Sequence, residues 1–236
     1  MKFLGIDLGW TSQPSGLCCL HYHDRRLHLL DLQRLAAIDD ILAWVDHWLP
    51  SGTSGGIAVD APTLIPNATG MRLPDRLTHQ HFGRYHAGCY PANLGRPFAE
   101  RTVSFGLSLE ARGFDHAPTI VPQQPTRFQI EVFPHPATVN LFRLDRILKY
   151  KKGKLAERRG ELERLRQLID HHLPQLEPML HLPSSSTMLP TIPTAGAALK
   201  VVEDQLDSLI CAYVAAYWWY WGSERCLALG DRDQGY

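Results

Sequence analysis

The stretch FLGIDLGW at residues 3–10 alternates apolar residues with small or polar ones, carries one acid, Asp7, and closes on a glycine and a tryptophan. This pattern is typical of a β-strand that ends in a turn. Residues 16–23 and 26–32 have the composition of two further strands, joined by a tight turn. Three consecutive strands at this spacing predict an antiparallel meander at the start of the fold.

Beyond the meander, helical and strand patterns alternate. Residues 37–49 have helical periodicity, and residues 56–60 are an apolar run without alternation, as in a buried central strand. The later elements are expected to be a strand at 127–133, helices at 136–148, 154–172 and 195–221, and a candidate final strand at 226–230. The meander with the strands at 56–60 and 127–133 predicts an α/β fold with a mixed five-stranded sheet and helices on both faces.

Length and composition place these elements in one domain. A chain of 236 residues with 44% hydrophobic residues is long enough for one large core, so we expect a single domain over residues 1–236. Residues 61–126 are rich in proline, glycine, histidine and arginine and lack a clear period. We interpret them as a long insertion.

Charge and cysteine content exclude several classes of protein. The 24 basic and 24 acidic residues cancel, so net charge identifies no partner and leaves the oligomeric state open. The five cysteines show no zinc-ligand spacing, which favours reduced thiols in the cytoplasm. The N-terminus lacks the pattern of a signal peptide. The most apolar run, residues 209–221, is shorter than the roughly 20 residues that cross a bilayer, so we expect no membrane partner.

Acidic residues occur where a buried strand would not normally tolerate them. Asp7 lies in the first apolar strand, Asp60 ends the strand at 56–60, and Glu131 lies between two apolar neighbours. A buried carboxylate is costly unless it is paired or binds a metal ion. Taken alone, an acid at a strand end is usually a turn or cap residue, and Glu131 could instead pair with a structural arginine. The combination favours a shared site.

Two further acids lie on the long C-terminal helix. Asp204 and Asp207 are three residues apart and therefore share a face, and that face becomes apolar one turn later. Both side chains are expected to point into the protein. The alternative is that the helix begins later and that both are acids of its first turn. Oxygen-only ligands suit Mg²⁺ or Mn²⁺ rather than zinc. We expect the metal ligands to be Asp7, Asp60, Asp204 and Asp207, with Glu131 binding or supporting the ions.

Four segments resemble a known family: GIDLG at residues 5–9, AVDAP at 58–62, EVFP at 131–134 and DQLDSLICA at 204–212. They are similar, in this order, to the family called domain of unknown function 429, which is regarded as predicted nucleases with a ribonuclease H-like fold. The acids of the first strand and of the C-terminal helix also resemble the catalytic set of Holliday-junction resolvases. That resemblance implies catalytic roles for Asp7, Asp204 and Asp207, completed by Asp60 or, in reserve, by Glu131.

Basic residues suggest where a substrate would bind. The segment 143–166 is rich in lysine and arginine, so Lys149, Lys151 and Lys152 are candidates for contact with a nucleic-acid backbone, the alternative being a solvated helix with Glu–Arg pairs. Arg72 and Asp75 resemble the Arg-x-x-Asp of the family, which implies that they line the site. The sequence thus leaves three hypotheses open: a metal-dependent nuclease, a nucleotide- or small-phosphate-handling enzyme, and a non-catalytic binding protein.

Overall fold

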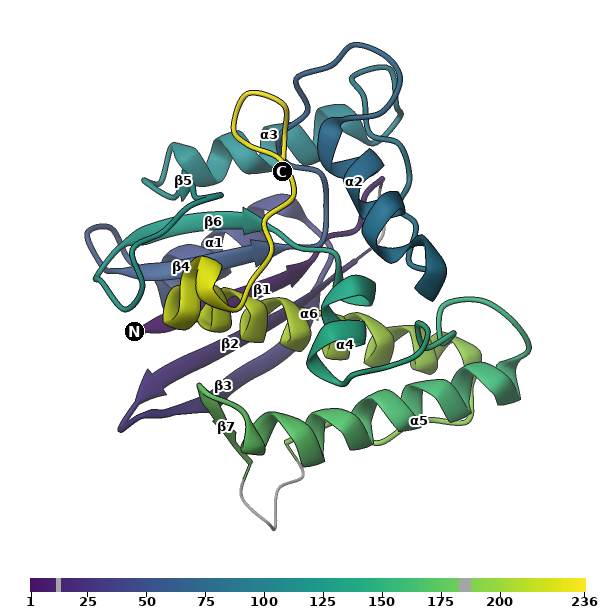
Figure 1. The fold of residues 1–236 in the computed structure, drawn as a ribbon. Coiled ribbons are helices and arrows are strands. Elements are labelled where there is room, and N and C mark those ends of the chain that lie inside the picture. Colours follow the sequence, from purple (N-terminus) through teal and green to yellow (C-terminus); the bar gives the residue numbers. More distant parts are fainter. Residues whose placement is uncertain (12–13, 183–187) are drawn as a thin grey trace.

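The computed structural model describes residues 1–11, 14–182 and 188–236. One mixed sheet, with strand order β5-β6-β4-β1-β2-β3-β7, runs through this part of the chain (Figure 1). The strands β1 (Lys2–Asp7), β2 (Ser15–His23) and β3 (Arg26–Leu35) form an antiparallel meander. The prediction of a meander from the first residues is therefore confirmed.

The second half of the sheet is parallel to β1. The strands β4 (Gly55–Val59) and β6 (Arg127–Glu131) pair so that Val59 faces Ile6 on one side and Glu131 on the other. Parallel neighbours end at the same edge of a sheet. This edge consequently carries the carboxyl ends of β1, β4 and β6.

The sheet has seven strands where the sequence predicts five. The additional strands, β5 (Asp115–His116) and β7 (Met179–His181), are two and three residues long and lie at the two edges. Segments this short carry no periodic pattern that could be recognised. The prediction of a final strand at 226–230 is wrong, because these residues form an irregular segment whose apolar side chains face a cavity instead.

Helices cover both faces of the sheet, as predicted (Figure 1). The helices α4 (Pro134–Leu141), α5 (Leu155–His172) and α6 (Gly196–Trp221) share a core with Phe3 and Phe128. The helices α1 (Ile38–Trp48) and α3 (Ala99–Glu110) pack on the other face, against Leu4 and Ile57. None of the helices in the described ranges has the length and apolar character needed to cross a membrane.

Two segments differ from their predicted secondary structure. The helix predicted at 136–148 is shorter and begins earlier, because Pro134 suits a first turn and Arg143, with a left-handed φ of 52°, lies just beyond its end. The expected irregular insertion at 61–126 contains α2 (Leu73–Phe82), α3 and β5. Single-turn 3₁₀ helices complete the elements at Gly83–Tyr85, Leu173–Gln175 and Gly222–Glu224.

Two glycines allow α6 to lie directly on the sheet. A Cβ atom at Gly5 in β1 would be 1.9 Å from the carbonyl oxygen of Ser208, and one at Gly16 in β2 would be 1.9 Å from that of Asp204. Any side chain at these positions would push the helix away. This close approach brings the acids of α6 next to the ends of the strands.

Candidate metal site

The site is built around three carboxylates from three elements. Asp7 is the last residue of β1, Asp60 directly follows β4, and Asp207 lies on the face of α6 that packs on the sheet. Their nearest carboxylate oxygens all lie within 4.8 Å of one another. We refer to Asp7, Asp60 and Asp207 as the acid triad. An oxygen-only donor set at this spacing fits Mg²⁺ or Mn²⁺.

Lys151 and Tyr150 contact the acid triad from the loop between α4 and α5. The Nζ atom of Lys151 lies 2.8 Å from Oδ2 of Asp207 and 3.7 Å from Oδ2 of Asp60. The hydroxyl group of Tyr150, which is fully buried, donates a 2.7 Å hydrogen bond to Oδ1 of Asp207. Oδ1 of Asp207 therefore has a hydrogen-bond donor on this loop, whereas its buried Oδ2 has an ion-pair partner there but accepts no hydrogen bond from the described residues.

The close packing of acids perturbs their protonation. Burial raises the pKa of Asp7 well above its usual range; Lys151 opposes this rise, and Asp60 and Asp207 add to it. Burial likewise raises the pKa of Asp60 to about 6, against the effect of Lys151. One lysine thus offsets only part of the negative charge, which leaves room for a divalent cation.

His135 lies beside this group and was not singled out by the sequence. Its ring centre is 5.4 Å from that of Tyr150, and burial lowers the pKa of the imidazole to about 4. It is therefore neutral at pH 7. The sequence around His135, Pro-His-Pro at the start of a helix, carries no local signal of function. The residues that His135 meets in space come from other segments of the chain.

Asp204 points into the protein, as predicted, but toward other partners. It is buried; Arg34 Nε in β3 donates to its Oδ2 at 2.7 Å, and Lys200 Nζ lies 2.8 Å from its Oδ1. Glu203, also buried, pairs with Lys200 at 2.6 Å and with Arg158 at 3.4 Å. Asp204 is thus not among the three carboxylates that lie within 4.8 Å of one another, although its charge still helps to raise the pKa of Asp7. Its role as a metal ligand stays a prediction.

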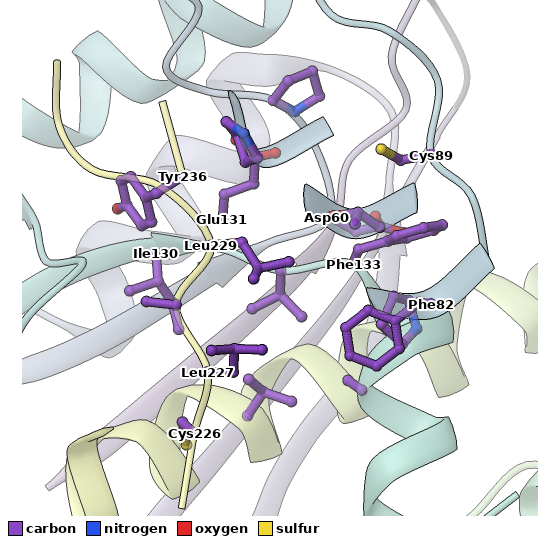
Figure 2. A pocket seen from close by; sticks show the side chains of 18 of the residues that line it. Asp60, Phe82, Cys89, Ile130, Glu131, Phe133, Cys226, Leu227, Leu229 and Tyr236 are labelled. Carbon is purple, nitrogen blue, oxygen red and sulfur yellow. The ribbon is translucent and has the colours of Figure 1, made fainter. Parts of the chain in front are cut away.

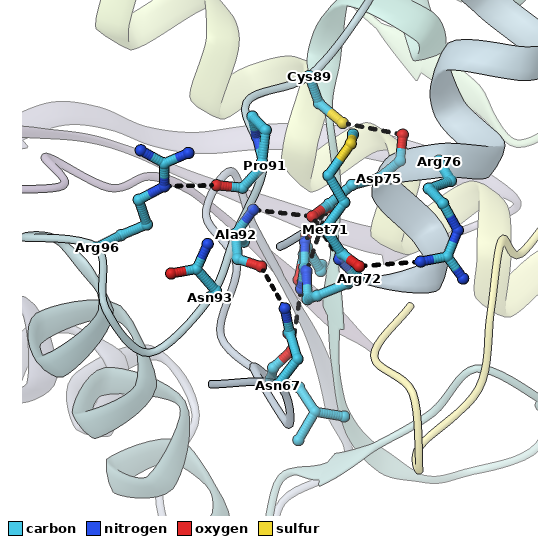
Figure 3. A network of polar contacts seen from close by, with 12 residues as sticks. Asn67, Met71, Arg72, Asp75, Arg76, Cys89, Pro91, Ala92, Asn93 and Arg96 are labelled. Atoms are coloured by element: carbon cyan, nitrogen blue, oxygen red, sulfur yellow. Dashed lines mark hydrogen bonds and ion pairs between the residues drawn. The ribbon is translucent and has the colours of Figure 1, made fainter. Parts of the chain in front are cut away.

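Glu131 belongs to a second polar network. Arg72 donates to Glu131 at 2.7 and 2.8 Å and to Asp75 at 2.9 and 3.2 Å. Asp75 also accepts hydrogen bonds from the backbone N–H groups of Arg72 and Ala92 (Figure 3). Glu131 is thus paired with a structural arginine, the alternative that its position in an apolar strand had left open. Substrate contact by Arg72 and Asp75 stays a prediction.

A cavity of about 380 Å³ lies beside the acid triad, with Asp60 in its wall (Figure 2). Its walls come from α2, the end of β6, α4, α6 and the C-terminal segment 226–236. Arg72, Asp75 and Glu131 also contribute to the wall, although their charged groups are paired with one another. The cavity therefore adjoins the acid triad at Asp60, which belongs to both.

The chain was compared with known proteins. The model of the family described as Protein of unknown function (DUF429) matches residues 5–234. The chain belongs to this family. No curated protein matches it.

Within this DUF429 chain, the basic residues predicted to bind substrate separate into two kinds. Lys149 and Lys152 are exposed, whereas Lys151 is half-buried and directed at the acid triad. The sequence did not reveal this difference, because the three lysines lie in one irregular segment. Leu148 and Tyr150 are buried, and Lys149 between them is exposed. This alternation of apolar and basic residues is a local sign that one side of the segment faces the protein interior.

Proposed function

We propose that this DUF429 protein is a divalent-metal-dependent nuclease that hydrolyses phosphodiester bonds of nucleic acid. The observation that carries the proposal is the acid triad, with carboxylate oxygens from β1, the end of β4 and α6 within 4.8 Å. Carboxylates this close repel one another in a protein interior unless cations compensate for their charge. Mg²⁺ or Mn²⁺ is the ion that such oxygen ligands favour.

The sheet supports a ribonuclease H-like assignment. Its five longest strands are ordered β3-β2-β1-β4-β6, with an antiparallel meander followed by parallel strands. This is the mixed sheet that the family resemblance implies. The carboxyl ends of parallel strands are also where ligands commonly bind in α/β sheets.

The residues of the site have distinct roles in this proposal. A bound Mg²⁺ or Mn²⁺ would activate water and offset charge on the phosphate. Asp7, Asp60 and Asp207 hold the ion. Tyr150 fixes the orientation of Asp207 through its hydrogen bond, and Lys151 supplies a built-in positive charge beside two of the acids. Three ionised carboxylates and one lysine would carry a net charge of −2, which one divalent ion would balance.

Manganese provides the direct test. In crystals soaked with Mn²⁺, we expect an anomalous peak among the three carboxylates, and we expect the wild-type protein to cleave at least one of single-stranded DNA, duplex DNA, a four-way junction or an RNA–DNA hybrid. Asp207→Asn should abolish both. Asp145→Asn, which changes an exposed acid of the neighbouring segment, is the matched control and should change neither. A map without a peak near the acid triad would refute the metal site.

Salt dependence tests whether the partner is a nucleic acid. Each phosphate contact contributes about 0.7 to 0.9 to the log–log slope of affinity against salt. If Lys149 and Lys152 contact phosphates, replacing both by alanine should make the slope shallower by roughly 1.4 to 1.8. Replacing Arg25 and Arg26, which are exposed at the far turn of the β2–β3 hairpin, should leave it unchanged.

A second candidate function is the hydrolysis of a nucleotide or another small phosphate compound by the same acids. The observation that favours it is the cavity beside Asp60, because a pocket of about 380 Å³ is in the size range of small-molecule sites. A panel of free nucleotides and oligonucleotides distinguishes the two.

A further inference from the structure

The cavity beside the acid triad has a reactive end and an apolar end. Asp60 belongs to both the acid triad and the cavity wall. Figure 2 shows Asp60, Phe133 and Phe82 on one side of the cavity, and Ile130, Leu227 and Leu229 toward the other. A molecule held in the cavity would therefore present one end to the carboxylates.

Aromatic side chains contribute much of the cavity wall. Trp10, Phe82, Tyr90 and Phe133 are among the residues that line it, and the indole N–H of Trp10 donates to the backbone carbonyl oxygen of Asp60 at 3.0 Å. Tyr90 is 68% exposed although it is a large ring. The arginines in the wall do not call for a charged ligand, because Arg72 is already paired with Glu131 and Asp75, and Arg225 is paired with its neighbour Glu224 and lies over the ring of Trp221. The surface offered next to the acids consequently suits a flat, largely apolar group.

We propose that this cavity binds the base of an unstacked nucleotide while its phosphate lies at the acid triad. The inference rests on the proposed hydrolysis of phosphodiester bonds, and it adds that the nucleotide at the site is unstacked from its neighbours. A nucleotide joins a flat aromatic ring to a phosphate through one sugar, which matches an aromatic wall that adjoins a cluster of carboxylates. Thr78 and Asn140, which also line the cavity, carry polar groups for the edge of the base.

This arrangement excludes a base that remains stacked in a duplex. A paired base is covered on both faces, so it must leave the helix before it can enter a pocket, which costs a few kcal/mol. A single strand, a loop or a free nucleotide avoids this cost. The structure thus predicts that the protein prefers unpaired nucleotides over duplex.

The test uses oligonucleotides that carry 2-aminopurine, a fluorescent base, with Ca²⁺ in place of Mg²⁺ to slow cleavage. We expect the single strand to bind at least tenfold more tightly than the matched duplex, with its fluorescence changed by contact with the aromatic wall. Phe133→Leu should weaken single-strand binding by roughly 5- to 150-fold, the range for loss of one stacking contact. Free 2-aminopurine nucleotide, run beside the strand, shows whether the base must belong to a chain.

A cavity-filling variant gives an independent measurement. Ala137 on α4 lines the cavity, so Ala137→Phe should occupy part of it and weaken single-strand binding by at least tenfold. Ala43→Phe is the matched control, because Ala43 is exposed on α1 at the other face of the sheet, and it should leave binding unchanged. The manganese-induced rise in Tm serves as a folding check for both variants.

The outcomes separate this inference from the proposed function. Tight binding of the single strand or of the free nucleotide that is weakened by both Phe133→Leu and Ala137→Phe supports the inference. The ligand that binds more tightly shows whether the base belongs to a strand or to a free nucleotide. Equal affinity for single strand and duplex, with Ala137→Phe without effect, overturns it and leaves a nuclease that holds the backbone alone. If manganese does not bind the acid triad either, the proposed function fails together with the inference.

Discussion

Asp60 directly follows β4 and Glu131 ends the neighbouring parallel strand β6 at the same edge of the sheet, but their surroundings differ. Glu131 accepts two hydrogen bonds from Arg72, which also holds Asp75, whereas Asp60 lies among the other acids of the acid triad with only the more distant Lys151 nearby. Burial raises the pKa of both, but for Glu131 the guanidinium group of Arg72 directly opposes the rise. One carboxylate is part of the framework, and the other is available to a ligand.

The same distinction applies to the two acids of α6. Asp204 is enclosed by Arg34 and Lys200, while Asp207 belongs to the acid triad. We refer to Asp75, Glu131, Glu203 and Asp204 as the paired acids, because each forms an ion pair with an arginine, whereas the acid triad has one lysine, Lys151, shared by Asp207 and Asp60. Paired acids should contribute to stability, and the acid triad should reduce it in the absence of metal. Three substitutions test this comparison.

The largest effect is expected from removing the arginine of the paired acids. Arg72→Met leaves Glu131 and Asp75 buried without their cation, and breaking a buried ion pair in this way costs about 3–5 kcal/mol. For a chain of 236 residues, the Tm should fall by roughly 6–20 °C. Calorimetry in the presence of EDTA measures it.

Arg76→Met provides the control for this variant. Arg76 lies on the same helix, α2, but is exposed, and its guanidinium donates to the carbonyl oxygen of Met71. Its replacement should change the free energy of unfolding by less than about 0.5 kcal/mol. Equal effects of the two substitutions would mean that the network of Arg72 adds nothing to stability.

A smaller effect of opposite sign is expected in the acid triad. Asp60→Asn removes a charge that the fold holds against repulsion and burial, so the metal-free protein should become more stable at pH 7 by on the order of 1–3 kcal/mol. Asp75→Asn, the matched change in the paired acids, should destabilise the protein instead. Urea unfolding of both variants measures the difference. A stability loss with Asp60→Asn would place Asp60 among the structural residues.

The pH dependence of this effect follows from the raised pKa of Asp60, about 6 in the fold against a usual value of 3.8. Between these two values the folded state binds more protons than the unfolded state, so the contribution of Asp60 to stability falls as the pH rises. The penalty is complete above pH 6 and absent below pH 4. The gain from Asp60→Asn should therefore disappear as the pH is lowered through this window.

Sequence patterns predicted the part of the site that depends on local geometry. Alternation and apolar runs located β1, β4 and β6, and parallel pairing then placed Asp7 and Asp60 at one edge. Helical spacing likewise showed that Asp204 and Asp207 face the interior. These features depend on periods of two or 3.6 residues, which a sequence displays directly.

The long-range partners of the acids could not be predicted, because they come from far along the chain, unlike Lys200, which lies four residues before Asp204. Arg34 contacts Asp204 across 170 positions, and Arg72 contacts Glu131 across 59. A period shows which way a side chain points, but it does not show which charge it will meet. Lys151 was assigned to substrate for the same reason, since nothing in an irregular lysine-rich segment distinguishes the residue that turns inward.

The smallest effect is expected for Asp204, and it decides between four metal ligands and three. From the sequence alone, Asp204 and Asp207 are equivalent members of the metal site. In the structure, two basic side chains, Arg34 and Lys200, engage the two oxygens of Asp204, and Asp204 is not among the carboxylates that lie within 4.8 Å of one another; Asp207 is, although it too has partners in Lys151 and Tyr150. Asp204→Asn should therefore change the Kd for Mn²⁺ by less than about threefold, which corresponds to less than about 0.7 kcal/mol.

Asp207→Asn, one helical turn away, is the comparison that gives this small effect its meaning. It removes an oxygen ligand from the acid triad, so titration calorimetry should show Mn²⁺ binding weakened by at least a hundredfold. Arg34 and Lys200 are partly exposed and can be hydrated when Asp204 loses its charge, so Asp204→Asn should remain folded and its titration interpretable. Equal losses in the two variants would return Asp204 to the metal site and show that its ion pairs open when metal binds. A loss confined to Asp207→Asn would establish that the paired acids hold the framework around a three-carboxylate site.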